Sequence, residues 1–217
     1  MKTFEVIQRS ESWYEVRRGV PTCSRFDQIL TPVQAKPAAA QETLINELLV
    51  ESIMPPEQGL IKGHMTEEME SGMILEAEAR CRYELEFASA PMTEVGFLMH
   101  ESGLFGGSPD ALVGEEGGVE IKCPAAVTHI GYLRAGALPN DYKCQVHGYL
   151  IVTGRPWWDF FSYCRNLPVF RLRVHRDDFT EKLAKELLNF CAKYKKARED
   201  FGIVDIKTAR EQELEKL

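Results

Sequence analysis

The chain has 217 residues, 44% of them apolar, and a formal net charge of −7. This length is typical of one globular domain, so we expect a single domain over residues 1–217, with a terminal helix and tail from about residue 177. No apolar run approaches the roughly 18 residues of a membrane helix, and the N-terminal residues lack the apolar centre of a signal peptide. We therefore expect no membrane contact and a cytoplasmic location.

Charge is unevenly distributed along the chain. Residues 42–120 carry 3 basic and 17 acidic side chains, whereas residues 121–176 carry 8 basic and 2 acidic side chains. An acidic block that ends in Asp110 and Glu120 and is followed by a basic block would suit a metal-dependent enzyme that acts on a polyanion. A solvated acidic helix surface beside an ordinary basic sheet explains the same distribution, and charge alone favours this simpler interpretation.

Apolar spacing predicts two helices in the first half of the chain, over about residues 38–53 and 65–87. The apolar residues of the first helix are Leu44, Leu48, Leu49 and Ile53. Proline and glycine predict loops on either side of it, at 31–37 and 54–59. Between residues 90 and 123, short turn-rich segments predict a meander of strands with a hairpin across Gly114–Gly118.

The second half predicts a helix, two strands and a last helix. A helix over 142–152 follows the start signal at 139–141 and ends at Gly154. Strands are expected over 157–164 and 169–175, and Asp177 or Asp178 caps the last helix. Together these elements predict an α/β fold of the α+β sandwich type, with a central mixed sheet flanked by helices.

The predicted hairpin places three charged residues on one face. Apolar residues two apart form its core face, and these are Ala111, Val113, Val119, Ile121 and Cys123. Asp110, Glu120 and Lys122 then share the opposite face, where opposed residues have Cβ atoms roughly 4.5 to 5.5 Å apart. Two carboxylates at that distance repel unless a cation lies between them, and hard oxygen donors suit Mg²⁺ or Mn²⁺. A surface hairpin with a simple Glu/Lys pair remains the alternative.

Five motifs in order give the sequence a resemblance to the phage lambda exonuclease family, a viral recombination branch of the PD-(D/E)xK nucleases. They are WYEVRRGVPTCS at 13–24, GMILE at 72–76, SPD at 108–110, EIKCP at 120–124 and DYKCQVH at 141–147. The resemblance covers about residues 13–174 and implies a restriction-endonuclease-like core. Cys23 replaces the usual alanine, and Ser71 stands where a tryptophan is often found.

The resemblance implies roles for nine residues. Two divalent ions, Mg²⁺ with Mn²⁺ as a substitute, would be held by Asp110, Glu120, the Ile121 carbonyl and Glu76. Lys122 and Gln145 would complete the catalytic set, and Arg17, Ser24 and Ser108 would grip a substrate phosphate. Spacing leaves alternatives open, because Glu76 can simply pair with Arg80, Gln145 can make an ordinary core hydrogen bond, and Arg17 can be a solvated helix charge.

The resemblance also implies an activity. A phage or prophage protein in a bacterial host would digest one strand of linear double-stranded DNA from a 5′-phosphate end, in the 5′ to 3′ direction, leaving 3′ overhangs for a single-strand annealing protein. Family members resemble ring-shaped homotrimers. Two alternatives remain, a restriction-type endonuclease with the same residues and a DNA-binding recombination scaffold that only retains the fold.

Overall fold

The fold is built from two β-sheets and the helices that pack on them. A computed structural model describes residues 1–54 and 67–203. For residues 67–74 of this range it describes the backbone alone. In chain order the elements are β1 (Lys2–Phe4), α1 (Glu11–Arg17), the 3₁₀ helix η1 (Cys23–Gln28), α2 (Gln41–Ile53), α3 (Glu67–Glu86), β2 (Met92–Thr93), β3 (Phe97–Met99), β4 (Gly106–Gly107), β5 (Ala111–Val113), β6 (Gly117–Lys122), α4 (Ala126–Ala135), α5 (Asn140–Thr153), β7 (Trp157–Ser162), β8 (Phe170–His175) and α6 (Asp178–Asp200).

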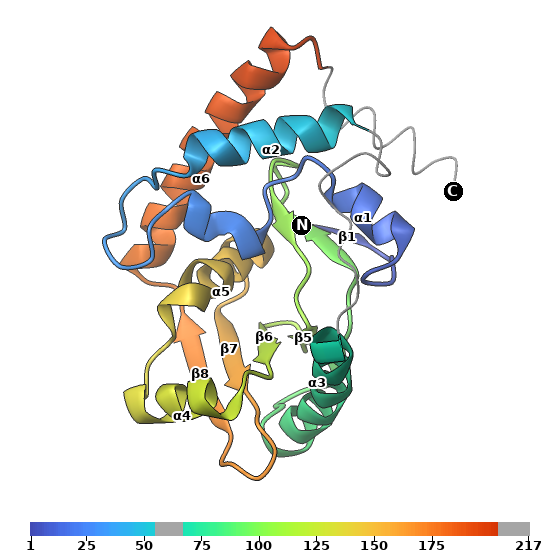
Figure 1. Cartoon of the computed structure of the whole chain (residues 1–217), viewed down its shortest axis with the longest axis vertical. Helices are drawn as coiled ribbons and strands as arrows, with labels where there is room; N and C mark the ends of the chain where they lie inside the picture. Colours follow the sequence, from blue (N-terminus) through green and yellow to red (C-terminus); the bar gives the residue numbers. More distant parts are fainter. Residues whose placement is uncertain (55–66, 204–217) are drawn as a thin grey trace.

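The larger sheet has five strands in the order β2-β5-β6-β7-β8. β6 and β7 are parallel, and every other neighbouring pair is antiparallel. Helices cover both faces, with α3 beside β5 and β6 and α5 beside β7 and β8 (Figure 1). The mixed sheet flanked by helices confirms the predicted α/β fold class.

Apolar side chains fill the space on both faces of this sheet. On the α3 side, a buried cluster contains Ala79, Tyr83, Ala111, Val113, Val119, Ile121, Trp157 and Phe161. The hairpin residues predicted as a core face all belong to this cluster or pack against it. On the other side, Trp158 and Phe160 are fully buried with the apolar faces of α2, α5 and α6. Each such side chain contributes roughly 1.5–3 kcal/mol by leaving water.

A second, three-stranded sheet has the order β1-β3-β4 and is antiparallel. It corrects the predicted single meander over 90–123, because β3 pairs with the N-terminal strand and β4 pairs with β3, outside the main sheet. β4 consists of two glycines, which carry no side chains and so give no alternating pattern. Other chain segments approach these glycines so closely that a side chain would collide with them: a Cβ on Gly107 would lie 2.7 Å from Cys23 Sγ.

The predicted helices are present with shifted ends. α2 lies within its expected range, α5 extends the predicted 142–152 helix by two residues at its start and one at its end, and Asp177 caps α6 through a reciprocal capping box with Thr180. Ile53 shares the apolar spacing of this helix but is 54% exposed, because it is the last residue of α2. The first residues of the predicted 65–87 helix, most of the 54–59 loop and the tail from 204 lie outside the described residues.

Three helices were not predicted from the sequence. α1, η1 and α4 have only seven, six and ten residues. α1 and α4 each bury one residue, Val16 and His129, so neither shows a repeating apolar stripe. Over the described residues, no helix is both long and apolar enough to cross a membrane.

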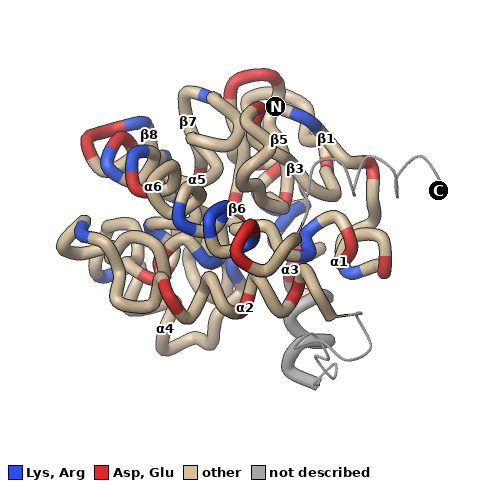
Figure 2. Tube along the Cα trace, turned by 90° about the horizontal axis from the view of Figure 1, so that it is seen from above, with Lys and Arg blue, Asp and Glu red and all other residues tan. Residues whose placement is uncertain are grey.

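The charge blocks of the sequence do not form separate halves of the molecule. Figure 2 shows basic and acidic residues interspersed along the described trace. Ion pairs join distant segments, as Arg165 does with Glu78 at 2.6 Å and Arg25 with Glu51 at 2.7 Å. The acidic residues of α2 and α3 are thus partly neutralised by arginines from elsewhere.

Candidate active site

The β5–β6 hairpin brings Asp110 and Glu120 together. Ala111 pairs with Val119 in the antiparallel register, so Asp110 before the first strand lies opposite Glu120. The Asp110 carboxylate accepts a 2.6 Å hydrogen bond from the backbone N–H of Ile121, which ties it across the hairpin. The structure therefore places the two carboxylates side by side, as the hairpin spacing predicts.

Glu120 is a buried carboxylate with unequal oxygens. Its Oε1 lies 2.6 Å from Lys122 Nζ and accepts a 2.6 Å hydrogen bond from Gln145 Nε2. Gln145 also donates to the hydroxyl of Tyr149 at 3.1 Å. The other oxygen, Oε2, is buried and no described residue forms a hydrogen bond with it. A buried acceptor without a partner costs about 1–3 kcal/mol, so this oxygen marks where a cation would be stabilising.

Burial and the charges of this cluster raise two pKa values, those of Asp110 and Lys122. Burial, together with the Glu120 carboxylate, raises the pKa of Asp110 well above its ordinary value. Burial alone lowers the pKa of Lys122, but the carboxylates of Glu120 and Asp110 outweigh it, and the pKa of Lys122 is raised. Lys122 is therefore an ammonium at neutral pH, and a cation bound beside Asp110 would favour its ionised, carboxylate form.

Glu76 comes from α3 and lies at the edge of the same site. Its carboxylate is 3.4 Å from Arg9 and 3.6 Å from Arg80. Arg80 also donates a 2.6 Å hydrogen bond to the Asp110 carbonyl, which holds α3 against the hairpin. Glu76 and Asp110 both line a cleft of about 440 Å³, which the 5–9 segment and Arg80 border. The Glu76–Arg80 pair considered from spacing is present.

The donor set fits a hard divalent cation. Asp110 and Glu120 supply carboxylate oxygens, one of them without a partner, and Ile121 adds a backbone carbonyl between Glu120 and Lys122 in the chain. Within residues 1–54 and 75–203, whose side chains the structure describes, no three His, Cys, Asp or Glu side chains converge into a group that could hold an ion. Glu76 thus stands in an ion pair with arginines, beside the two-carboxylate core.

Arg17 and Ser108 meet across 91 positions of the chain. Arg17 donates a 3.1 Å hydrogen bond to the Ser108 hydroxyl, and Trp13 Nε1 donates to the same oxygen at 2.8 Å. The Arg17 guanidinium also lies 4.0 Å from the centre of the Trp13 ring. Burial lowers the pKa of Arg17, and none of the described carboxylates forms an ion pair with it. Arg17 is therefore an inward-facing cation held by a serine and a tryptophan, which differs from a solvated helix charge.

Ser24 lies in the neighbouring segment without joining this contact. It is exposed, and its hydroxyl lies 3.3 Å from that of Thr22. Thr22 forms an isolated parallel bridge with Gly106, two residues before Ser108. The structure thus brings the Ser24 segment alongside the Ser108 segment, with no described hydrogen bond from Ser24 to Arg17 or Ser108.

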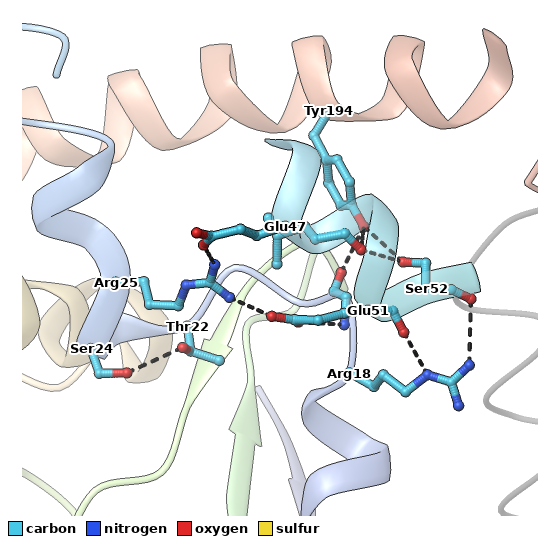
Figure 3. Close-up of polar contacts among 10 residues, drawn as sticks. Arg18, Thr22, Ser24, Arg25, Glu47, Glu51, Ser52 and Tyr194 are labelled. Atoms are coloured by element: carbon cyan, nitrogen blue, oxygen red, sulfur yellow. Dashed lines mark hydrogen bonds and ion pairs between the residues drawn. The ribbon is translucent and has the colours of Figure 1, made fainter. Parts of the chain in front are cut away.

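α2 holds the segment that links these residues (Figure 3). The Glu51 carboxylate accepts hydrogen bonds from Gly19 N at 3.1 Å and from Arg25 at 2.7 Å. Arg18 donates a 2.6 Å hydrogen bond to the Glu51 carbonyl. Gly19 has a φ of +62°, which a glycine adopts readily. These contacts fix both ends of the turn that separates Arg17 from Ser24.

Sequence reasoning missed several neighbours of the predicted residues. Tyr149 donates a 3.0 Å hydrogen bond to the Ser108 carbonyl and accepts one from Gln145, so it joins the phosphate-binding candidates to the carboxylates. Trp13 holds Ser108, and Arg9 pairs with Glu76. Tyr149 follows Gln145 by four residues and so lies on the same helix face, and this spacing was the sequence feature that could have indicated their contact. Nothing in the sequence pattern pointed to Arg9.

Comparison with known families gives the chain its relatives. The model of the YqaJ-like viral recombinase domain matches residues 12–156. The chain belongs to this family. The matched range contains every predicted site residue, from Arg17 to Gln145. Among curated proteins, none matches the chain significantly.

Solved structures agree with membership of the YqaJ-like recombinase family. An alkaline exonuclease from Laribacter hongkongensis is 33% identical, with a TM-score of 0.75 over 93% of this chain and 99% of that one. The same exonuclease in complex with dAMP is 31% identical, with a TM-score of 0.70 over 90% and 100% of the two chains. A phage related exonuclease from Haemophilus somnus 129PT shares the fold, at 14% identity and a TM-score of 0.61 over 81% and 92%. Together, family and relatives support a nuclease that acts on DNA in recombination.

Proposed function

We propose that this YqaJ-like recombinase-family protein is a Mg²⁺-dependent exodeoxyribonuclease. It digests the 5′-ended strand of linear double-stranded DNA in the 5′ to 3′ direction and leaves 3′ overhangs for strand annealing. The observation that carries the proposal is the Asp110–Glu120–Lys122 cluster, in which one buried carboxylate oxygen has no described partner. A structural ion pair would leave no such oxygen, because a buried acceptor is normally satisfied.

The metal ions would be held by Asp110, Glu120 and the Ile121 carbonyl, with Glu76 at the edge of the site. When bound, two divalent ions supply positive charge that stabilises both the attacking and the leaving oxygens of a phosphodiester, and Mn²⁺ is expected to substitute for Mg²⁺. Glu76 already sits beside the Asp110 end of the hairpin, because Arg80 bonds both. A cation there would offset both the burial and the repulsion from Glu120 that raise the pKa of Asp110.

Lys122 and Gln145 act around this core. The raised pKa of Lys122 keeps it charged, so it serves as a hydrogen-bond donor that orients the attacking water and offsets negative charge on the phosphate. Gln145 holds the Glu120 carboxylate through its amide, and Tyr149 holds Gln145. These contacts fix the carboxylate before substrate arrives, which is how an active site limits reorganisation during the reaction.

Arg17 and Ser108, with Ser24 from the adjacent segment, are proposed to bind the 5′-terminal phosphate. A guanidinium and a hydroxyl are donors that suit a phosphate group. The related Laribacter exonuclease was solved in complex with dAMP, a nucleoside monophosphate, and that observation supports a nucleotide-sized substrate end. A ring-shaped homotrimer and a single-strand annealing partner complete the proposal and rest on the family resemblance alone.

Replacing Lys122 tests the chemical step. Lys122→Met should lower the turnover of linear duplex by roughly 10²–10⁴-fold, the range for a lost group that handles a proton or positions water, because the donor is removed. Binding of duplex in Ca²⁺ should be kept. Lys143→Met, on α5 beside Phe179, is the matched control and should retain turnover. Near-normal digestion by Lys122→Met would remove Lys122 from the mechanism.

A further inference from the structure

The segment before α1 is fixed at both of its ends. The Gln8 amide donates 2.9 Å hydrogen bonds to two backbone carbonyls, those of Val95 and Pro109. Ser10 caps α1 by accepting a hydrogen bond from Trp13 N at 3.3 Å. Pro109 immediately precedes Asp110, so the Gln8 contact ties this segment directly to the carboxylate hairpin.

Arg9 lies between these two anchors and lines the cleft beside Asp110. Its backbone has a φ of +71°, which is uncommon for a residue with a side chain. Its guanidinium is half exposed and lies 3.4 Å from Glu76 Oε2. The anchored segment therefore presents a positive charge to the cleft at the point where Glu76 and Asp110 border it.

Arg9 is the more exchangeable of the two arginines that line the cleft. Arg80 is engaged by the Asp110 carbonyl at 2.6 Å, by Glu94 at 3.2 Å and by Glu76 at 3.6 Å. The Arg9 guanidinium forms a single ion pair among the described residues, at 3.4 Å in a half-exposed position. Such an exposed pair contributes little to stability, so a competing anion can displace it easily.

We propose that Arg9 binds a DNA backbone phosphate in this cleft and rests on Glu76 while DNA is absent. The inference deepens the proposed function and depends on DNA being the substrate. The lining carries four carboxylates, Glu5, Glu76, Glu94 and Asp110, so a phosphate needs a free cation there. A guanidinium matches phosphate geometry with two parallel hydrogen bonds. Arg17 does not line this cleft, so Arg9 contacts a phosphate other than the terminal one.

Equilibrium binding to linear duplex in Ca²⁺, measured over a series of salt concentrations, tests the proposal. Arg9→Gly removes the guanidinium and suits the positive φ, so its thermal unfolding should match the wild type. Loss of one phosphate contact should weaken binding about 8-fold at about 0.1 M salt and reduce the slope of log K against log salt by about 0.9. Arg9→Lys should keep part of the binding affinity and part of the salt slope that Arg9→Gly loses.

Arg165→Gly is the matched control. Arg165 is 56% exposed and pairs at 2.6 Å with Glu78 of α3, the helix that also carries Glu76, but it does not line the cleft. It should leave the slope unchanged. An unchanged slope for Arg9→Gly would overturn the proposal and make Arg9 a structural link to α3. If wild-type protein neither binds nor digests duplex, the proposed function fails instead. If the wild type binds and digests duplex normally and Arg9→Gly has the same slope, the Arg9 inference alone is rejected.

Discussion

Individual residues of the site gain their properties from neighbours both near and far in the sequence. Glu120 is held by Gln145 from α5 and by Lys122 two residues along its own strand. Arg17 loses water on folding and receives a serine and a tryptophan instead of a carboxylate. Two electrostatic demands remain: Oε2 of Glu120 has no described partner although Oε1 is paired with Lys122, and Arg17 has no described carboxylate partner. That pair of demands is what a metal-assisted phosphate site requires.

Asp110 should destabilise the metal-free protein at neutral pH. Its pKa is raised by burial and by Glu120, so the folded state binds a proton more tightly than the unfolded chain does. Stability therefore falls as pH rises from about 4, the ordinary aspartate pKa, up to the raised folded value. Asp110→Asn, which keeps an acceptor for Ile121 N–H, should be more stable than wild type in EDTA at neutral pH.

Chemical unfolding of both proteins in EDTA, from about pH 4 to about pH 8, measures this difference. The advantage of the variant should grow with pH and then level off. Saturating Mg²⁺ should stabilise the wild type more than the variant, because only the native carboxylate site binds the ion well. A variant that is less stable than wild type in EDTA at neutral pH would show that Asp110 is a structural residue.

Arg17 should govern the preference for a 5′-phosphate end. Wild-type protein should digest phosphorylated ends faster than hydroxyl ends, because a charge-assisted hydrogen bond to phosphate contributes about 1.5–3 kcal/mol, roughly 10- to 150-fold in rate. Arg17→Ala should slow the phosphorylated substrate toward the hydroxyl one and change the hydroxyl rate little. Rates on both substrates at fixed salt provide the measurement. Equal slowing of both would assign Arg17 to general DNA contact or folding.

At the scale of elements, the site depends on close approach between the β4 segment, η1 and α5. A Cβ on Gly107 would lie 2.7 Å from Cys23 Sγ and 2.8 Å from Tyr149 Cε1. Ser108 follows directly and carries the contact with Arg17. The dipeptide of glycines is therefore a packing requirement that places Ser108 between α1 and α5.

Gly107→Ala should lower the free energy of unfolding by about 1–3 kcal/mol, because the added methyl group overpacks this junction. Gly131→Ala, in α4, has no atom within 4 Å of the new Cβ and should instead add about 0.4–1 kcal/mol. Urea unfolding of the two variants separates the steric effect of the added methyl group from the general effect of replacing glycine by alanine. Equal free energies of unfolding for Gly107→Ala and wild type would show that the surrounding segments accommodate the methyl group without loss of stability.

Elements with a regular apolar period could be predicted from the sequence, and the others could not. The β5–β6 hairpin alternates and turns at 114–116, within the predicted 114–118, so the Asp110–Glu120 juxtaposition follows from local spacing. β4 has no side chains to alternate, and α4 buries one residue. The contact between Arg17 and Ser108 spans 91 positions and depends on how two sheets pack. Local pattern carries no such information, so the motif resemblance was its sole indication.

At the scale of the whole molecule, a protein with a net charge of −7 is proposed to act on a polyanion. Many of its described arginines pair with acidic residues across the fold. Basic and acidic residues are interspersed along the described trace (Figure 2). Phosphate affinity would then come from a few placed cations, Arg17, Lys122 and Arg9, together with bound metal ions. Few phosphate contacts mean weak general binding, which is compatible with moving along DNA.

The most direct test of the account uses one duplex sequence in two forms, a linear molecule labelled at its 5′ ends and a covalently closed circle. Incubation with Mg²⁺ should release labelled mononucleotide from the linear form and leave the circle intact, and EDTA should stop the release. Cutting of the circle would contradict the account in favour of an endonuclease. Digestion that begins at the 3′ ends, or that proceeds in EDTA, would contradict the proposed polarity or the metal site.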